Sequence, residues 1–109
     1  MLRFSPDAGA PKLEYDGRFR VPQQLKAGMS MILPVDFTGS PTPSATWHFR
    51  GTPLAPSGKY QVDTSEYNTT LTVRDPEIED SGTYNVTVSN RAGTASASFD
   101  INFKGKYIL

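Results

Sequence analysis

The sequence predicts an all-β fold in which two antiparallel sheets pack face to face as a sandwich. Two observations carry this prediction. Short segments alternate apolar and polar residues at a period of two, and clusters of Gly, Pro, Ser and Asn separate these segments. No segment keeps a helical period over about ten residues. The chain of 109 residues fits one domain, which at this size buries roughly two-thirds of its unfolded surface.

The chain divides by composition into three parts. Residues 1–10 contain Gly, Pro and Ser without a sustained pattern, and we expect a linker or flexible N-terminal segment there. Residues 11–103 form the predicted domain. Residues 104–109 are predicted to be a C-terminal linker or tail, because chain ends are commonly loose unless they are docked.

Five segments show the alternation, and each has one face that we expect to point into the core. These inward residues are Met31, Leu33, Val35 and Phe37; Ala45, Trp47 and Phe49; Leu71 and Val73; Tyr84, Val86 and Val88; and Ala95, Ala97, Phe99, Ile101 and Phe103. Pro34 interrupts the first segment on its other face. Because proline has no amide hydrogen for a ladder, we expect this segment to be an edge strand or to contain a bulge.

The connections between these segments have distinct compositions. Residues 50–58 are predicted to form a short edge strand between two loops, and residues 75–82 an acidic crossing from one sheet to the other. We expect Ile78 to be the apolar anchor of that crossing. Residues 89–93 are predicted to be a hairpin connection, with Gly93 available for a positive φ.

Charge and cysteine content exclude several classes of protein. Eleven Lys and Arg balance eleven Asp and Glu without a run of one sign, which argues against nucleic acid or an anionic membrane as partner. No apolar run approaches the ~20 residues of a membrane span. Cysteine is absent, which favours a reducing compartment and excludes thiolate metal sites and cysteine nucleophiles.

Few residues suggest catalysis or cofactor binding. His48 is the one histidine and is predicted to face solvent, and a single His without Cys makes a poor zinc site. The serines lie in loops or on predicted solvent faces, so no Ser-His-Asp triad is indicated. We therefore expect no enzymatic activity, no cofactor, no metal and no small-molecule substrate.

An acidic segment and two glycosylation motifs leave alternatives open. Asp75, Glu77, Glu79 and Asp80 could supply oxygens to calcium, but they lack the interleaved pattern of a calcium loop, so we prefer a solvated acidic turn. The sequence also contains N-x-T acceptors at residues 68–70 and 85–87. Such acceptors matter only in a secreted protein and support an extracellular alternative.

Three stretches together resemble a known family. "GSPTPSATW", "NTTLTV" and "DSGTYNVTVSNRAG" are similar to G-x-P-x-P-x-x-x-W, x-L-x-V and D-x-G-x-Y-x-C-x-V-x-N-x-x-G, the signatures of intermediate-set (I-set) immunoglobulin domains. The longer stretch over residues 11–47 resembles immunoglobulin domains of the titin and twitchin type of giant muscle protein. The resemblance implies an immunoglobulin-like sandwich with Greek-key topology.

The resemblance also implies structural roles for single residues. Trp47 would be the core tryptophan of the third strand, and Leu71 the core leucine of the x-L-x-V stretch. Asp80 and Gly82 would build the turn that precedes Tyr84, and the Tyr84 hydroxyl would bond back to the upstream backbone.

Val35 and Val86 occupy the two positions where extracellular relatives hold their disulfide cysteines. The resemblance thus implies a domain without a disulfide. In a reducing cytosol a disulfide does not persist, whereas two β-branched valines fill the same space with apolar volume.

The function that the resemblance implies is structural. The chain would be a non-enzymatic, load-bearing spacer in the tandem array of a modular muscle or cytoskeletal scaffold protein, in the cytoplasm and within the sarcomere. Its partners would be neighbouring immunoglobulin or fibronectin type III domains and sarcomeric proteins. The alternatives are an extracellular adhesion or receptor domain that binds a protein ligand, and a module beside the catalytic domain of a giant kinase.

Overall fold

The structure is a computed structural model and describes residues 9–105. Within these residues, one sheet has four strands in the spatial order β1 (Gly9–Glu14), β3 (Met31–Ser40), β7 (Asn68–Val73) and β6 (Tyr60–Ser65). The other has five, in the order β2 (Gln23–Lys26), β9 (Gly93–Lys104), β8 (Gly82–Asn90), β4 (Ser44–Phe49) and β5 (Thr52–Pro53). Two short 3-10 helices complete the described part, namely η1 (Gly17–Arg20) and η2 (Ile78–Asp80).

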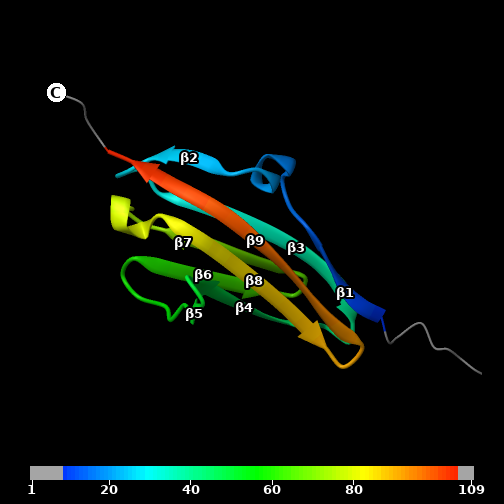
Figure 1. The fold of residues 1–109 in the computed structure, drawn as a ribbon. Coiled ribbons are helices and arrows are strands. Elements are labelled where there is room, and N and C mark those ends of the chain that lie inside the picture. Colours follow the sequence, from blue (N-terminus) through cyan, green and yellow to red (C-terminus); the bar gives the residue numbers. More distant parts are fainter. Residues whose placement is uncertain (1–8, 106–109) are drawn as a thin grey trace, which may run out of the picture.

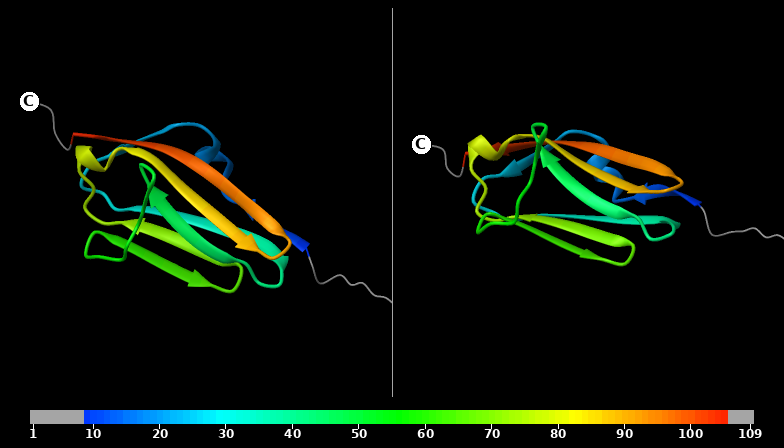
Figure 2. Two further views of the ribbon diagram at one scale, coloured as in Figure 1. Left: turned by 60° about the horizontal axis from the view of Figure 1, so that its bottom comes forward. Right: turned by 90° about the horizontal axis from the view of Figure 1, so that it is seen from below.

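The two sheets face each other, which confirms the predicted all-β sandwich (Figures 1 and 2). The strand pairs are antiparallel with one exception in the described residues, because β2 runs parallel to β9. β1 begins at one end of the molecule and β9 ends at the other (Figure 1). The strands include Gly9, Ala10 and Lys104, which the sequence assigns to the flanking segments.

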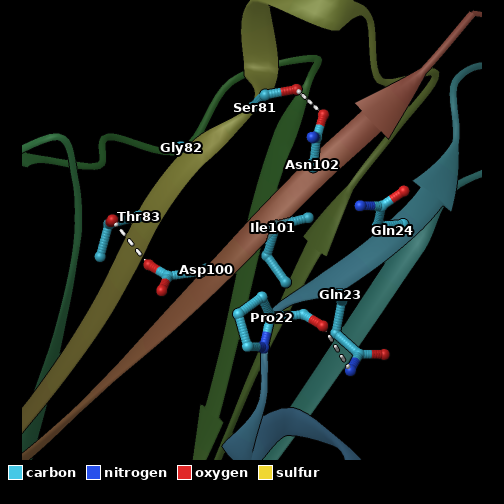
Figure 3. Close-up of a pocket in the computed structure, with 9 residues that line it drawn as sticks. All are labelled: Pro22, Gln23, Gln24, Ser81, Gly82, Thr83, Asp100, Ile101 and Asn102. Atoms are coloured by element: carbon cyan, nitrogen blue, oxygen red, sulfur yellow. Dashed lines mark hydrogen bonds between the residues drawn. The ribbon is translucent and has the colours of Figure 1, made fainter.

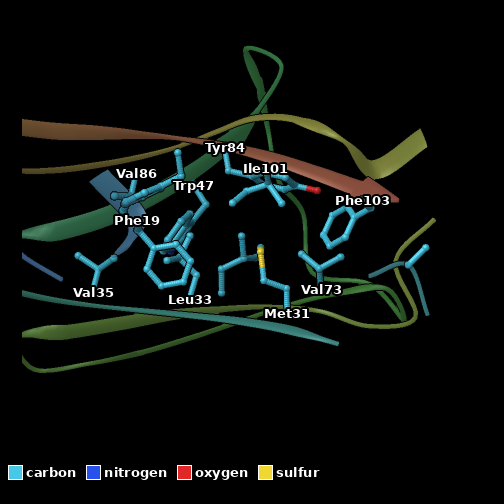
Figure 4. Packing of buried hydrophobic residues seen from close by; sticks show 13 residues of the cluster. Phe19, Met31, Leu33, Val35, Trp47, Val73, Tyr84, Val86, Ile101 and Phe103 are labelled. Carbon is cyan, nitrogen blue, oxygen red and sulfur yellow. The ribbon is translucent and has the colours of Figure 1, made fainter. Parts of the chain in front are cut away.

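The alternation along the strands separates the core from the surface. In β3, Met31, Leu33, Val35 and Phe37 are buried, whereas the residues between them are exposed. Figure 4 shows residues of both sheets meeting between the layers, among them Val35, Trp47 and Val86. Leu71, Tyr84 and Val86 have no exposed surface, and Trp47 is 2% exposed.

The chain changes sheets near its beginning. β1 pairs with β3 in one sheet, and after η1 the chain continues as β2, which pairs with β9 in the other sheet. The buried Phe19 of η1 lies against Phe99 of β9, with ring centroids 6.1 Å apart. This crossing leaves β3 without a neighbour on one side over its first residues, since β1 ends where Glu14 pairs with Asp36.

The crossing explains why Pro34 is tolerated inside the sheet. The Phe37 amide donates to the Tyr67 carbonyl on the β7 side, so alternate residues of β3, including Pro34, point their main-chain groups the other way. No strand lies beside Pro34 on that side. β3 is therefore an edge only over this stretch, and its register with β7 is regular, without a bulge.

Two predictions about the connections are wrong. Ile78 does not anchor the acidic crossing, because it is 59% exposed. Pro76 and Asp80 are the buried residues there, because the turn of η2 directs the Asp80 side chain inward. Gly93 has no positive φ and belongs to β9, because the Asn90 side chain closes the turn by accepting from the amides of Ala92 and Gly93.

The core position of Val86 leads to the first test. Val86 pairs with Trp47 on the neighbouring strand, and Val86→Ala should lower the free energy of unfolding by about 1–3 kcal/mol because it leaves a cavity. Urea unfolding followed by tryptophan fluorescence measures this change. The exposed Ser96 provides a control, since Ser96→Ala should have little effect. A loss below about 0.5 kcal/mol in Val86→Ala would contradict a core role.

Candidate interaction site

A buried hydrogen bond links the two sheets at the core tryptophan. Trp47 Nε1 of β4 donates to Thr69 Oγ1 of β7 at 2.9 Å, and Thr69 has no exposed surface. A second threonine, Thr64, shares this hydroxyl at 3.0 Å. Thr69 lies opposite Val35 in the ladder, and Trp47 lies opposite Val86. The Trp47 donor is thus satisfied in the layer that also holds Val35 and Val86.

The turn that enters β8 is held by Tyr84. Its hydroxyl donates to the Asp80 carbonyl at 2.6 Å, and its ring stacks on Phe49 at a centroid distance of 4.5 Å. Burial strongly raises the pKa of Tyr84. Gly82 has a φ of 150°, and a Cβ there would lie 2.9 Å from Nε of Arg50, so this position requires glycine.

Asp80 is the centre of a polar cluster at this corner. Its carboxylate accepts hydrogen bonds from Lys59 Nζ at 2.8 Å, from the Tyr60 hydroxyl at 2.9 Å and from the Glu77 amide at 2.8 Å. Burial by itself would raise the pKa of Asp80, but the bonds from Lys59, Glu77 and Tyr60 outweigh it and lower the pKa. The bond to Asp80 also raises the pKa of Lys59. Asp80 therefore acts as a structural carboxylate.

The neighbouring acidic residues lie at the surface. Asp75, Glu77 and Glu79 have exposed side chains, whereas Asp80 points inward. In the part of the chain that the structure describes, no three His, Asp or Glu side chains come together as metal ligands. His48 is half-buried in β4, where it pairs with Asn85 and Pro53.

The two N-x-T asparagines use their amide groups within the sheets. Asn68 Nδ2 donates to Asp36 at 2.7 Å, and Asn85 Nδ2 donates to Ser98 Oγ at 2.9 Å. Each side-chain carbonyl accepts from the threonine of its own motif, Thr70 or Thr87. The nitrogen atoms that would carry a glycan thus already bind a neighbouring strand.

Asn90 has a structural role that was not predicted from the sequence. Its Nδ2 donates to the carbonyls of Gly9 and Pro41, both at 2.9 Å, while its Oδ1 closes the turn between β8 and β9. One side chain therefore ties β1, the loop after β3 and the hairpin together at one end of the molecule. Asn90 corresponds to the N of the family signature, which marks the position. The signature does not show which residues Asn90 binds, because Gly9 and Pro41 are distant in the sequence.

A shallow hollow of about 410 Å³ lies over the outer face of the five-stranded sheet (Figure 3). Its polar groups bind each other: Thr83 donates to Asp100 at 2.9 Å, and Ser81 contacts Asn102 at 3.5 Å. The first bond joins β8 to β9, and the second joins the residue before β8 to β9.

β9 has no ladder partner on its outer side over its first residues. β2 pairs only with residues 101–104 of β9, although the strand begins at Gly93. Asn90 and Gly93 close a two-residue hairpin turn, so their main-chain groups bond to each other. Counting along β9 from Gly93, the even-numbered residues therefore point their main-chain groups away from β8. Ser96, Ser98 and Asp100 are exposed residues of this outward set. β1 lies close to β9, with Ala10 beside Gly93, but β1 pairs with β3 and not with β9. The main-chain groups of this stretch of β9 therefore form an edge without a strand partner, which could accept an extended segment.

The order of the strands in the two sheets is that of a β-sandwich of the immunoglobulin type. Residues 18–103 match the family described as "Immunoglobulin I-set domain". The chain belongs to the I-set immunoglobulin family.

Relatives with similar sequences are much longer proteins. The chain is 32% identical to titin of Drosophila melanogaster over 84 residues, or 77% of this chain and 0% of that protein. It is 30% identical to hemicentin-2 of Mus musculus over 115 residues, or 95% of this chain and 2% of that protein. It is 33% identical to slow-type myosin-binding protein C of Rattus norvegicus over 84 residues, or 76% of this chain and 14% of that protein.

Solved structures of titin domains have the same fold. Titin domain M4 superposes with a TM-score of 0.80 at 23% identity, covering 89% of this chain and 98% of that one. Titin domain M7 superposes with a TM-score of 0.76 at 26% identity, covering 92% and 99%. The described residues contain no helix that is long and apolar enough to cross a membrane.

The lowered pKa of Asp80 predicts how stability depends on pH. The folded-state pKa lies below the unfolded value of about 3.9, so this carboxylate stabilises the fold fully above that value, and the contribution is lost as the pH falls through the folded pKa. Asp80→Asn should lower the free energy of unfolding by about 1–3 kcal/mol at neutral pH. Its stability should also fall less steeply than that of the wild type below about pH 5.

Urea unfolding at a series of pH values measures both effects. Glu66 is exposed in the turn between β6 and β7, so Glu66→Gln should keep the pH dependence of the wild type. An Asp80→Asn variant with unchanged acid sensitivity would show that other carboxylates dominate.

The open edge predicts an alternating pattern of amide hydrogen exchange. By the hairpin register, the amides of Ala97 and Phe99 point toward β8, whereas those of Ser96 and Ser98 point away from it. We expect Ala97 and Phe99 to exchange roughly a hundredfold more slowly, because their exchange requires the strands to open. Exchange followed residue by residue by NMR measures this ratio. Equal protection of all four amides would mean that the edge is covered.

Proposed function

We propose that the chain is a non-enzymatic structural and protein-interaction module, which acts as a load-bearing spacer in the tandem array of a muscle or cytoskeletal scaffold protein. The observation that carries this proposal is the parallel pairing of β2 with β9. β2 belongs to the N-terminal part of the chain and β9 to the C-terminal part, and the two ends of the described chain lie at opposite ends of the sandwich (Figure 1).

This geometry decides how a stretching force acts. Tension applied through the two chain ends pulls β2 and β9 in opposite directions along their common axis. The hydrogen bonds between the two strands are then loaded together in shear and do not break one at a time. Resistance of this kind depends on the unfolding barrier and not on the equilibrium free energy of unfolding.

The open edge of β9 supports the interaction part of the proposal. Main-chain donors and acceptors of an extended partner segment would continue the five-stranded sheet beyond β9. Two titin neighbours of the same fold were solved in complexes, Z1Z2 with telethonin and M10 with obscurin-like 1. We expect partners of the present chain to be proteins too, including neighbouring immunoglobulin or fibronectin type III domains.

The relatives support the setting of the module. Titin and myosin-binding protein C are far longer than this chain, which spans only a small part of each. The absence of cysteine suits a reducing compartment. We therefore propose a cytoplasmic location in the sarcomere.

Force spectroscopy of a tandem protein that contains several copies of this domain tests the mechanical role. Each copy should give one cooperative force peak. The Ala27 amide donates to the Lys104 carbonyl of β9. Because main-chain groups alternate in direction along a strand, the amide of Leu25, two residues earlier, also points toward β9. Leu25→Pro should lower the peak force, because proline removes a donor from the sheared ladder.

Gln24→Pro is the matched control for this experiment. The Gln24 amide points away from β9, so proline there removes no bond of the ladder. Gln24→Pro should therefore lower the peak force less than Leu25→Pro does. A force curve without peaks in the wild type would overturn the load-bearing proposal. Equal losses in the two proline variants would assign the resistance to another pair of strands.

A further inference from the structure

A notch opens at the flank of the sandwich where the chain has changed sheets. It lies between β2 and β3, encloses about 250 Å³, and is lined by Arg18, Leu25, Lys26, Met29 and Ile32 among others. β1 has already ended at this level, so no strand covers β3 beside Ile32. Met29 is 65% exposed and Ile32 57% exposed. The notch is therefore an apolar depression that the fold itself leaves uncovered.

The rim of the notch is positively charged. Lys26 lies next to Lys104 in the parallel ladder, and neither lysine has an acidic partner within ion-pair distance among residues 9–105. Arg18 lies 3.9 Å from the exposed Asp16, and its guanidinium lies over the Phe19 ring, 4.9 Å from the centroid. No acidic residue lines the notch. An apolar group with carboxylates beside it would complement this surface.

The chain itself carries a group of that chemistry at the η2 corner, which comprises Glu77, Ile78 and Glu79. Ile78 is 59% exposed, and both glutamates are exposed. Within the described chain, Glu79 takes part in no ion pair. The acidic segment that stands out in the sequence thus surrounds an apolar side chain that its own fold does not bury.

The corner and the notch lie at the same end of the molecule. The Gly28 amide, next to Met29, donates to the Pro76 carbonyl at 2.8 Å, two residues before Ile78. Two complementary patches that adjoin on one surface can pair with a second copy about a twofold axis. In such a pair, each patch meets the other patch of the partner.

We propose that this end of the molecule is a self-association surface, in which the notch of each copy receives Ile78 of a second copy and Lys26 faces Glu79. The contact is separate from the open edge of β9 and does not depend on the load-bearing role. Lys26 and Lys104 on the rim complement the exposed Glu77 and Glu79, so charge favours the acidic corner of a second copy as the occupant. The patches are small compared with stable interfaces of about 1,000 Å² or more, and we expect a weak dimer.

Sedimentation equilibrium of the full chain between about 10 μM and 1 mM tests this dimer. The wild type should show a rising average mass at the upper concentrations. Lys26→Glu and Glu79→Lys should each weaken association at least about tenfold, because each places like charges together at both contacts. An equimolar mixture of the two variants should restore the dimer, because every contact then joins a lysine and a glutamate.

Three further variants sharpen the experiment. Ile78→Ser should abolish association without touching a charge, and Met29→Ser should do the same from the notch side. Glu66→Lys makes the same charge change in an exposed turn away from this surface and should associate like the wild type. All of these positions are exposed, so thermal unfolding should show that each variant remains folded.

The outcomes separate clearly. A wild type that stays monomeric at the highest concentration overturns the proposal. So does a mixture of Lys26→Glu and Glu79→Lys that fails to associate, since this would show that the two residues do not face each other. Association that survives Ile78→Ser would overturn the role of the corner. This result would leave the proposals about the β9 edge and the load-bearing role unaffected.

Discussion

The carboxylate of Asp80 joins parts of the chain that are distant in the sequence. It accepts hydrogen bonds from Lys59 and Tyr60 at the start of β6 and from the Glu77 amide. The main-chain carbonyl of Asp80 accepts a further bond from the Tyr84 hydroxyl of β8. These bonds secure the passage from one sheet to the other. They also require the turn of η2 to direct Asp80 inward, which leaves Ile78 facing solvent. The same constraint therefore stabilises the corner and exposes the side chain that we propose to meet a second copy.

A second constraint comes from the change of sheets between β1 and β2. Because β2 joins β9 in parallel, a stretching force loads this ladder in shear. Because β2 is short, β9 keeps an open edge before residue 101. Because β1 stops opposite Asp36, β3 tolerates Pro34 and the notch beside Ile32 stays uncovered. One crossing thus produces the mechanical geometry and both candidate contact surfaces.

The centre of the sandwich holds together without a covalent bond between the sheets. Val35 and Val86 have no exposed surface, and the bond from Trp47 to Thr69 lies in the same layer. A disulfide there would add roughly 3–4 kcal/mol on the chain-entropy model, but only where it can persist. Packed valines and one satisfied indole donor provide cohesion that does not depend on redox conditions.

Much of the fold could be predicted because strand alternation is a local property. Apolar residues at every second position determined by themselves which faces of β3, β4, β7, β8 and β9 are buried, and the motif spacing determined the family. The exposure of Ile78 and the backbone conformation of Gly93 were predicted wrongly. Asp80 turns inward to meet Lys59, which is distant in the sequence, and the Asn90 side chain closes its turn by accepting from the amides of Ala92 and Gly93. The open edge and the notch were decided by the tertiary structure alone. They depend on where strands far apart in the sequence begin and end beside each other, and no local pattern encodes that.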